Sequence, residues 1–97
     1  MHIRVIILDS LVRYPDDNST VPLTGLEYWD RRSTTSAEAL ETVWRICNAA
    51  PTKLTETELA LRDVWDAAAG GLGLSVGDVV EVDGKQFRCT NDGWAAV

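Results

Sequence analysis

The chain offers few residues whose type and spacing could support acid–base or nucleophilic chemistry. Its histidine, His2, follows Met1, where we expect the chain end to fray, whereas general acid–base catalysis needs a titratable group held in place. The serines lack a second histidine and the glycine pattern of a nucleophile elbow. Cys89 follows Arg88, which can lower a thiol pKa, but the strand register predicted below turns Cys89 into the core. We therefore expect no catalytic residue and no enzyme activity.

Groups of possible metal or phosphate ligands are also poorly spaced. Residues 16–18, Asp-Asp-Asn, lack the alternating ligands and central glycine of a calcium loop and indicate a solvated turn. Asp63 and Asp66 are neighbours on a helix, where the simpler interpretation is a solvated polar face. The glycines of residues 70–73 follow a helix and lack the lysine of a phosphate loop. We expect no metal and no cofactor.

Size and cysteine content favour one small cytoplasmic domain. A chain of 97 residues can form a single core with little room for a deep cleft. No segment approaches the roughly 18 apolar residues of a membrane span, and Arg4 lies inside the N-terminal apolar run, which argues against a secretory signal. Cys47 and Cys89 are far apart and are expected to be buried, reduced thiols.

The charge balance is acidic. The formal net charge is -6, so the surface repels phosphates, and we expect no direct binding to nucleic acid. The alternative is a nucleic-acid mimic that binds a basic partner. A mimic needs a dense acidic stripe, whereas here arginines are interleaved with the acids. These arginines are Arg13, Arg31, Arg32, Arg45, Arg62 and Arg88. Solubility is the simpler reason for the sign of the charge.

Periodicity predicts two strands in the N-terminal third. Residues 2–9 are rich in β-branched side chains and predict an interior strand with Ile3, Val5 and Ile7 on one face. Residues 26–31 predict a second strand. Both of its faces mix polar and apolar side chains, which favours a position at the sheet edge.

Two amphipathic helices are predicted next, over residues 36–48 and 56–69. Each begins with a capping-box pattern, Thr35 with Glu38 and Thr55 with Glu58. The apolar stripes expected in the core are Leu40, Val43, Trp44 and Cys47 in the first helix and Leu61, Val64, Trp65 and Ala68 in the second.

The C-terminal block predicts a hairpin over residues 78–90 and a short terminal strand over residues 94–97. The dipeptide Asp83-Gly84 is a preferred two-residue hairpin turn, because both central positions need a positive φ. The facing pairs are then Val80 with Phe87, Val82 with Lys85, Glu81 with Gln86 and Val79 with Arg88. We expect a single α+β domain with an antiparallel or mixed sheet of three to five strands, two helices on one face and a C-terminal hairpin.

One surface segment has the composition of a binding patch. Trp29 lies on the predicted edge strand and is followed by Asp30, Arg31 and Arg32. Tryptophan and arginine are enriched at interface hot spots. Trp94, after a tight turn, is a second candidate, although the simpler interpretation is an aromatic cap that closes the open end of the hairpin. An exposed edge near Trp29 can also pair with a second copy, which would give a homodimer.

The C-terminal block resembles the end of the YodL-like family, small domains of phages, plasmids and conjugative elements. The matching residues are Leu74-Ser75-Val76-Gly77-Asp78-Val79-Val80, Phe87-Arg88-Cys89 and Gly93-Trp94. The upstream strand and the helix that ends at Asn48 are also similar, so the resemblance covers about residues 26–97. It implies no catalytic residues. It implies a protein of a mobile element, acting in the cytoplasm of a bacterial host.

These observations favour a non-enzymatic interaction module that binds a host or element protein through Trp29, Asp30, Arg31, Arg32 and Trp94. The alternative is an acidic mimic that inhibits a host defence nuclease. It predicts a cluster formed by Glu38, Glu41, Glu56, Glu58, Asp63 and Asp66 on one face. A small hydrolase or nuclease is the least supported class.

Overall fold

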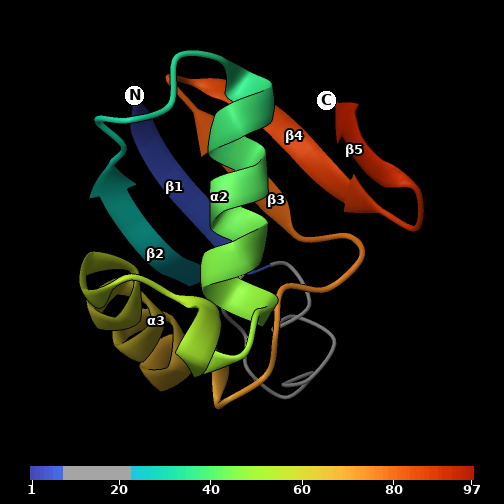
Figure 1. The fold of residues 1–97 in the computed structure, drawn as a ribbon. Coiled ribbons are helices and arrows are strands. Elements are labelled where there is room, and N and C mark those ends of the chain that lie inside the picture. Colours follow the sequence, from blue (N-terminus) through green and yellow to red (C-terminus); the bar gives the residue numbers. More distant parts are fainter. Residues whose placement is uncertain (8–22) are drawn as a thin grey trace.

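Antiparallel pairing of five strands builds the sheet that carries this fold (Figure 1). The computed structural model describes residues 1–7 and 23–97. Within them the strands are β1 (His2–Ile7), β2 (Leu23–Trp29), β3 (Val79–Val82), β4 (Lys85–Thr90) and β5 (Gly93–Ala96). The helices are α2 (Ser36–Asn48) and α3 (Glu56–Ala69), and the short 3-10 helix η1 (Pro51–Lys53) lies between them.

The sheet order is β2-β1-β3-β4-β5. The predicted α+β class is confirmed, with two helices and a C-terminal hairpin, and the sheet is entirely antiparallel. The first strand is interior and the second lies at an edge, as their side-chain patterns predicted. In Figure 1, α2 crosses one face of the sheet and α3 lies beside β2. Within the described residues, neither helix has the length and apolar character that a membrane span requires.

Two sequence predictions fall outside the described residues. One is the end of the first predicted strand, at Leu8 and Asp9, and the other is the turn at residues 16–18.

The second strand differs in its bounds from the sequence prediction. It begins earlier, at Leu23, and ends at Trp29 rather than at Arg31. The strand stops because the Asp30 carboxylate accepts hydrogen bonds from the backbone N–H groups of Arg32 and Ser33, which turns the chain away from the sheet.

One face of the sheet and both helices enclose the core. Ile3, Val5 and Ile7 of β1 are buried on the same face, as their alternation predicted. They belong to one cluster with residues of β2, β3, α2 and α3. The largest side chain in the cluster is Trp65, which is fully buried. The buried residues of α2 are Ala39, Leu40, Val43, Ile46 and Cys47.

Gly25 allows Trp65 to reach the sheet. The pairing of β1 with β2 shifts between Val5 and Ile6, so that Gly25 forms a bulge. A Cβ atom at this position would lie 2.7 Å from Cδ1 of Ile7 and 2.8 Å from Cζ3 of Trp65. Glycine therefore provides the space into which the indole packs.

Two residues of the predicted apolar stripes are not in the core. Trp44 is 44% exposed and Val64 is 54% exposed. Each lies beside the buried stripe of its helix. In α2 the stripe is completed by Ala39 and Ile46 instead of Trp44, and in α3 it runs through Trp65 and its neighbours one turn away.

The hairpin register agrees with the sequence prediction. Asp83 has a φ of 48° and Gly84 a φ of 84°, as a two-residue turn of this kind requires. The facing pairs are Val79 with Arg88, Val80 with Phe87, Glu81 with Gln86 and Val82 with Lys85. Burial of the two thiols is also confirmed: the pKa of Cys47 rises to about 12, and that of Cys89 is raised for the same reason.

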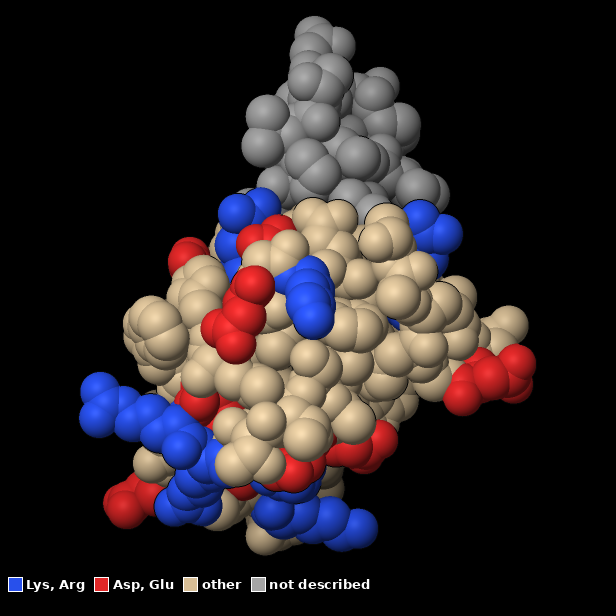
Figure 2. All heavy atoms as spheres, turned by 90° about the horizontal axis from the view of Figure 1, so that it is seen from above, with Lys and Arg blue, Asp and Glu red and all other residues tan. Residues whose placement is uncertain are grey.

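Charged side chains of both signs are interleaved on the surface. Figure 2, which shows the molecule from above, has Lys and Arg side chains between the Asp and Glu side chains. Two of the acidic residues that the mimic hypothesis places in one cluster are paired with arginines. Glu58 pairs with Arg45, and Oδ1 of Asp66 lies 3.1 Å from Nε of Arg62.

Candidate functional site

The segment from Trp29 to Ser33 forms a tight turn at the end of the edge strand. Its anchor is Asp30, which is only 6% exposed. Oδ1 of Asp30 accepts hydrogen bonds from the backbone N–H of Arg32 at 2.9 Å and of Ser33 at 2.8 Å, and Oδ2 accepts from Oγ of Ser33 at 2.6 Å. Burial alone would raise the pKa of Asp30, but these bonds hold it below its usual value. Asp30 shapes the turn, whereas Trp29, Arg31 and Arg32 are exposed on it.

Trp29 is the most exposed of the four tryptophans, with 69% of its surface accessible. The ring of His2 meets the indole edge-on, with ring centroids 5.5 Å apart. Nε2 of His2 lies 2.7 Å from Oε1 of Glu27. The backbone N–H of His2 donates to the Asp83 carboxylate, and its carbonyl accepts from the Asp83 N–H. His2 is thus held in the sheet, and the expectation that it frays is wrong. It supports one side of the exposed indole.

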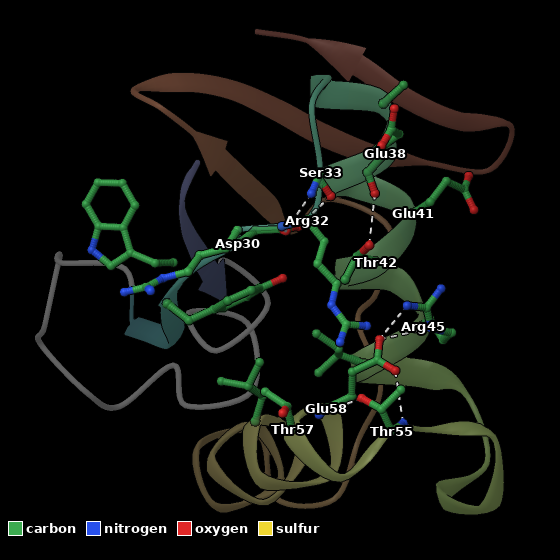
Figure 3. Close-up of a pocket in the computed structure, with 16 residues that line it drawn as sticks. Asp30, Arg32, Ser33, Glu38, Glu41, Thr42, Arg45, Thr55, Thr57 and Glu58 are labelled. Carbon is green, nitrogen blue, oxygen red and sulfur yellow. Dashed lines mark hydrogen bonds and ion pairs between the residues drawn. The ribbon is translucent and has the colours of Figure 1, made fainter.

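A pocket of about 760 Å³ adjoins this turn. Its walls come from the end of β2, the turn after it, the outer side of α2 and the first turns of α3 (Figure 3). The volume lies within the roughly 300–1,000 Å³ that ligand pockets occupy. Trp29, Arg31 and Arg32 all line it, so the predicted patch and the pocket form one continuous surface.

An ion pair between the two helices forms part of the pocket lining. Nε of Arg45 donates to Oε2 of Glu58 at 3.1 Å, and Nη2 of Arg45 also contacts that oxygen. Oε1 of Glu58 accepts from the backbone N–H of Thr55 at 3.0 Å, and Oγ1 of Thr55 accepts from the N–H of Glu58. The predicted capping box is therefore present. Burial raises the pKa of Glu58, but the bonds from Arg45 and Thr55 outweigh it and hold the pKa below its usual value.

The first helix is capped differently from the prediction. Oγ1 of Thr35 accepts from the N–H of Glu38 at 3.2 Å, as expected. The Glu38 carboxylate, however, bonds to Thr34: it accepts from Oγ1 at 3.0 Å and from the backbone N–H at 3.4 Å. The Glu38 carboxylate therefore bonds to Thr34 instead of to Thr35, as a capping box would require. These bonds occupy the carboxylate, which lies at the edge of the pocket.

Two residues of the pocket lining have a polar side-chain group without a partner among the described residues. The Tyr28 hydroxyl is fully buried and makes no hydrogen bond. Burial raises the pKa of Tyr28 far above its usual value, so the group remains a phenol and a donor. The side chain of Arg32 extends into the pocket on the side of Arg45 and Glu58 in Figure 3, and it forms no ion pair within residues 1–7 and 23–97.

Trp94 lies elsewhere. It belongs to β5, at the sheet edge opposite β2, where it faces Cys89 and packs against the core. The structure therefore does not bring Trp94 together with Trp29. Its contacts agree with an aromatic cap at the end of the hairpin, the other interpretation that the sequence left open.

Sequence reasoning missed Tyr28, Thr42, Arg45 and Glu58 as members of one site. The capping box marked Glu58, but only as a helix start. Nothing in a single sequence shows that β2, α2 and α3 meet around one pocket. Within the described residues, no three His, Cys, Asp or Glu side chains are grouped as metal ligands.

Comparisons with protein-family models, curated proteins and solved structures find no match to this chain. The similarity to the YodL-like family therefore stays a prediction, and the functional argument depends on the site itself.

Proposed function

We propose that this chain is a non-enzymatic interaction module that binds a partner protein through Trp29, Arg31, Arg32 and the adjoining pocket. The observation that carries the proposal is the exposure of Trp29. A tryptophan side chain that is 69% exposed contributes nothing to the core and leaves a large apolar surface in water. It lies beside a pocket and two arginines, and these residue types dominate hot spots in interfaces.

The geometry around Trp29 also supports binding. The ring of His2 contacts the indole edge-on, which restricts the Trp29 side chain before a partner covers it and lowers the entropy lost on binding. Its strand, β2, is an edge strand, whose outer backbone groups can pair with an added strand. The resemblance adds the setting: an accessory protein of a phage or mobile element, acting on a host or element protein in the bacterial cytoplasm.

The test is a quantitative pull-down from a bacterial lysate with three forms of the immobilised chain, the wild type and two variants. We expect a protein that is retained by the wild type and by Trp44→Ala and lost by Trp29→Ala. Trp44 is the matched control, because it is also an exposed tryptophan, 44% exposed, on a different element. Recovery of the same proteins by all three forms would contradict the proposal.

A second copy of the chain is an alternative occupant of the same edge. Size-exclusion chromatography with light scattering separates the two cases. A dimer that dissociates in Trp29→Ala would identify the partner as the chain itself, whereas a monomer leaves the partner as another protein.

The nucleic-acid mimic remains the second candidate, supported by the net charge of -6. It has less support than the interaction module, because Glu58 and Asp66 are paired with arginines and Glu38 is bonded to Thr34. Its test is inhibition of a restriction endonuclease by the wild type. The triple variant Glu41→Gln, Glu56→Gln, Asp63→Asn should lose that inhibition if the mimic interpretation is correct.

A further inference from the structure

The pocket beside Trp29 has an imbalance between donors and acceptors. The Tyr28 hydroxyl is buried there without an acceptor among the described residues. Such a group is costly to leave unpaired, and native structures seldom do so without a reason. The guanidinium of Arg32 is directed into the same pocket and forms no ion pair in the described part of the chain. The pocket wall therefore presents a guanidinium that no carboxylate of the described residues neutralises.

The acidic residues around the pocket do not supply that acceptor. Asp30 is bonded to its own turn, Glu38 to Thr34, and Glu58 to Arg45 and Thr55. Glu41 is exposed on α2, and its side chain is directed away from Arg32 in Figure 3. Arg31 and Arg32 both line the pocket and form no ion pair in the described part of the chain, and Figure 3 shows Arg32 directed into it. This side of the pocket therefore complements a negative charge, although the whole chain is acidic.

We propose that the pocket receives the carboxylate of an aspartate or glutamate side chain that belongs to a segment of the partner protein. The carboxylate accepts hydrogen bonds from Arg32, and an apolar side chain next to it in the segment packs on Trp29. This inference rests on the proposed function, since it specifies the chemistry that the same surface recognises.

A segment of protein fits this site better than a small free anion does. A pocket of about 760 Å³ is much larger than one carboxylate needs, and the exposed indole beside it offers contact area that only a ligand with apolar parts would use. Charge-assisted hydrogen bonds to a carboxylate are about twice as strong as neutral ones, so the acidic side chain supplies the specificity.

The experiment is an NMR titration of the ¹⁵N-labelled chain with the peptide acetyl-Phe-Glu-Phe-amide and its neutral isostere acetyl-Phe-Gln-Phe-amide. We expect saturable shifts at Arg32, Trp29 and Tyr28 with a dissociation constant below about 1 mM for the Glu peptide, and binding about tenfold weaker for the Gln peptide. Arg32→Gln should abolish the difference between the peptides. Arg88→Gln, the control at an exposed arginine of β4 that does not line the pocket, should retain it.

Three results would overturn the inference: no saturable shift with the Glu peptide, equal affinity for the two peptides, or equal effects of Arg88→Gln and Arg32→Gln. Titration with glutarate is the fourth arm, and binding as tight as that of the Glu peptide would replace the protein segment with a small carboxylate. The ¹⁵N spectrum of each variant reports its fold, so a loss of binding is separable from a loss of structure.

The two proposals fail in different ways. A captured partner that depends on Trp29, together with equal affinity for the Glu and Gln peptides, would leave the interaction module standing and remove the carboxylate site. Tighter binding of the Glu peptide than of the Gln peptide, without any captured partner, would leave the carboxylate site standing and remove the interaction module.

Discussion

Arg45 of α2 and Glu58 of α3 form an ion pair that joins the two helices beside the pocket. The side chain of Glu58 is 11% exposed, and its other oxygen completes the capping box with Thr55. One carboxylate thus starts a helix, ties that helix to its neighbour and lines the candidate site. Removing it should loosen all three features together.

The first prediction concerns this carboxylate. Glu58→Ala should lower the free energy of unfolding by about 1–2 kcal/mol, because it removes a helix cap and leaves Arg45 without its partner. Urea denaturation monitored by circular dichroism measures the change. Glu41→Ala, an exposed position on α2, is the control and should stay within about 0.5 kcal/mol of the wild type. Equal losses in the two variants would mean that the ion pair and cap contribute nothing specific.

The second prediction is the pH dependence of stability. The pKa of Glu58 is lowered in the folded state from an ordinary value of 4.5. The unfolded chain therefore binds a proton at a higher pH than the folded chain does. The stabilisation from Glu58 is fully present above pH 4.5 and is lost as the pH falls through the lower, folded-state pKa.

Measurement of the unfolding free energy across this acidic range should show a steeper fall with decreasing pH for the wild type than for Glu58→Ala. Asp30, whose pKa is also lowered, adds to the fall in both proteins and does not affect the difference. Parallel curves for the two proteins would show that Glu58 has the same pKa in the folded and unfolded states.

The third prediction concerns the unpaired hydroxyl of Tyr28. Tyr28→Phe removes a buried donor that has no acceptor in the described part of the structure. The variant should be as stable as the wild type or more stable by up to about 1 kcal/mol, because no hydrogen bond is lost and a desolvation cost is relieved. Thermal unfolding provides the measurement. A loss above about 1 kcal/mol would indicate that the hydroxyl has a hydrogen-bond partner.

The fourth prediction tests the bulge in β2. Gly25→Ala should cost about 1–3 kcal/mol, because the added Cβ meets Ile7 and the rigid ring of Trp65 at distances below van der Waals contact. Adding Ile7→Val removes the Cδ1 atom, which is the nearest contact, at 2.7 Å. The double variant should therefore recover part of the stability relative to the sum of the single changes. Strictly additive losses would argue against a steric cause.

Local rules were sufficient for much of the fold. The α2 and α3 helices cover the residues that periodicity and capping predicted, because caps and apolar spacing act within a few residues of the chain. The Asp83-Gly84 turn likewise fixes its own backbone angles, and the register of the hairpin follows from it.

Local rules were insufficient where neighbouring elements compete for space. Trp44 and Val64 have the spacing of core residues, yet the stripe that faces the sheet passes beside them. The turn after Trp29 ended β2 early, because the carboxylate of Asp30 bonded to the backbone in place of a strand partner. Packing decides which side of each helix is buried. The Asp30 turn is local, since its hydrogen bonds reach only two and three residues along the chain, but the strand pattern did not reveal it.

By itself, the sequence determined the fold class, the two helices, the hairpin and the composition of the turn around Trp29, since all of these follow from local propensity and short-range spacing. Only the tertiary structure decided that Tyr28, Arg32, Arg45 and Glu58 line one pocket beside that tryptophan, and that Trp94 lies at the opposite edge of the sheet. The physical reason is that the pocket is made by three successive elements, β2, α2 and α3, and the way they meet depends on the shared core that they bury.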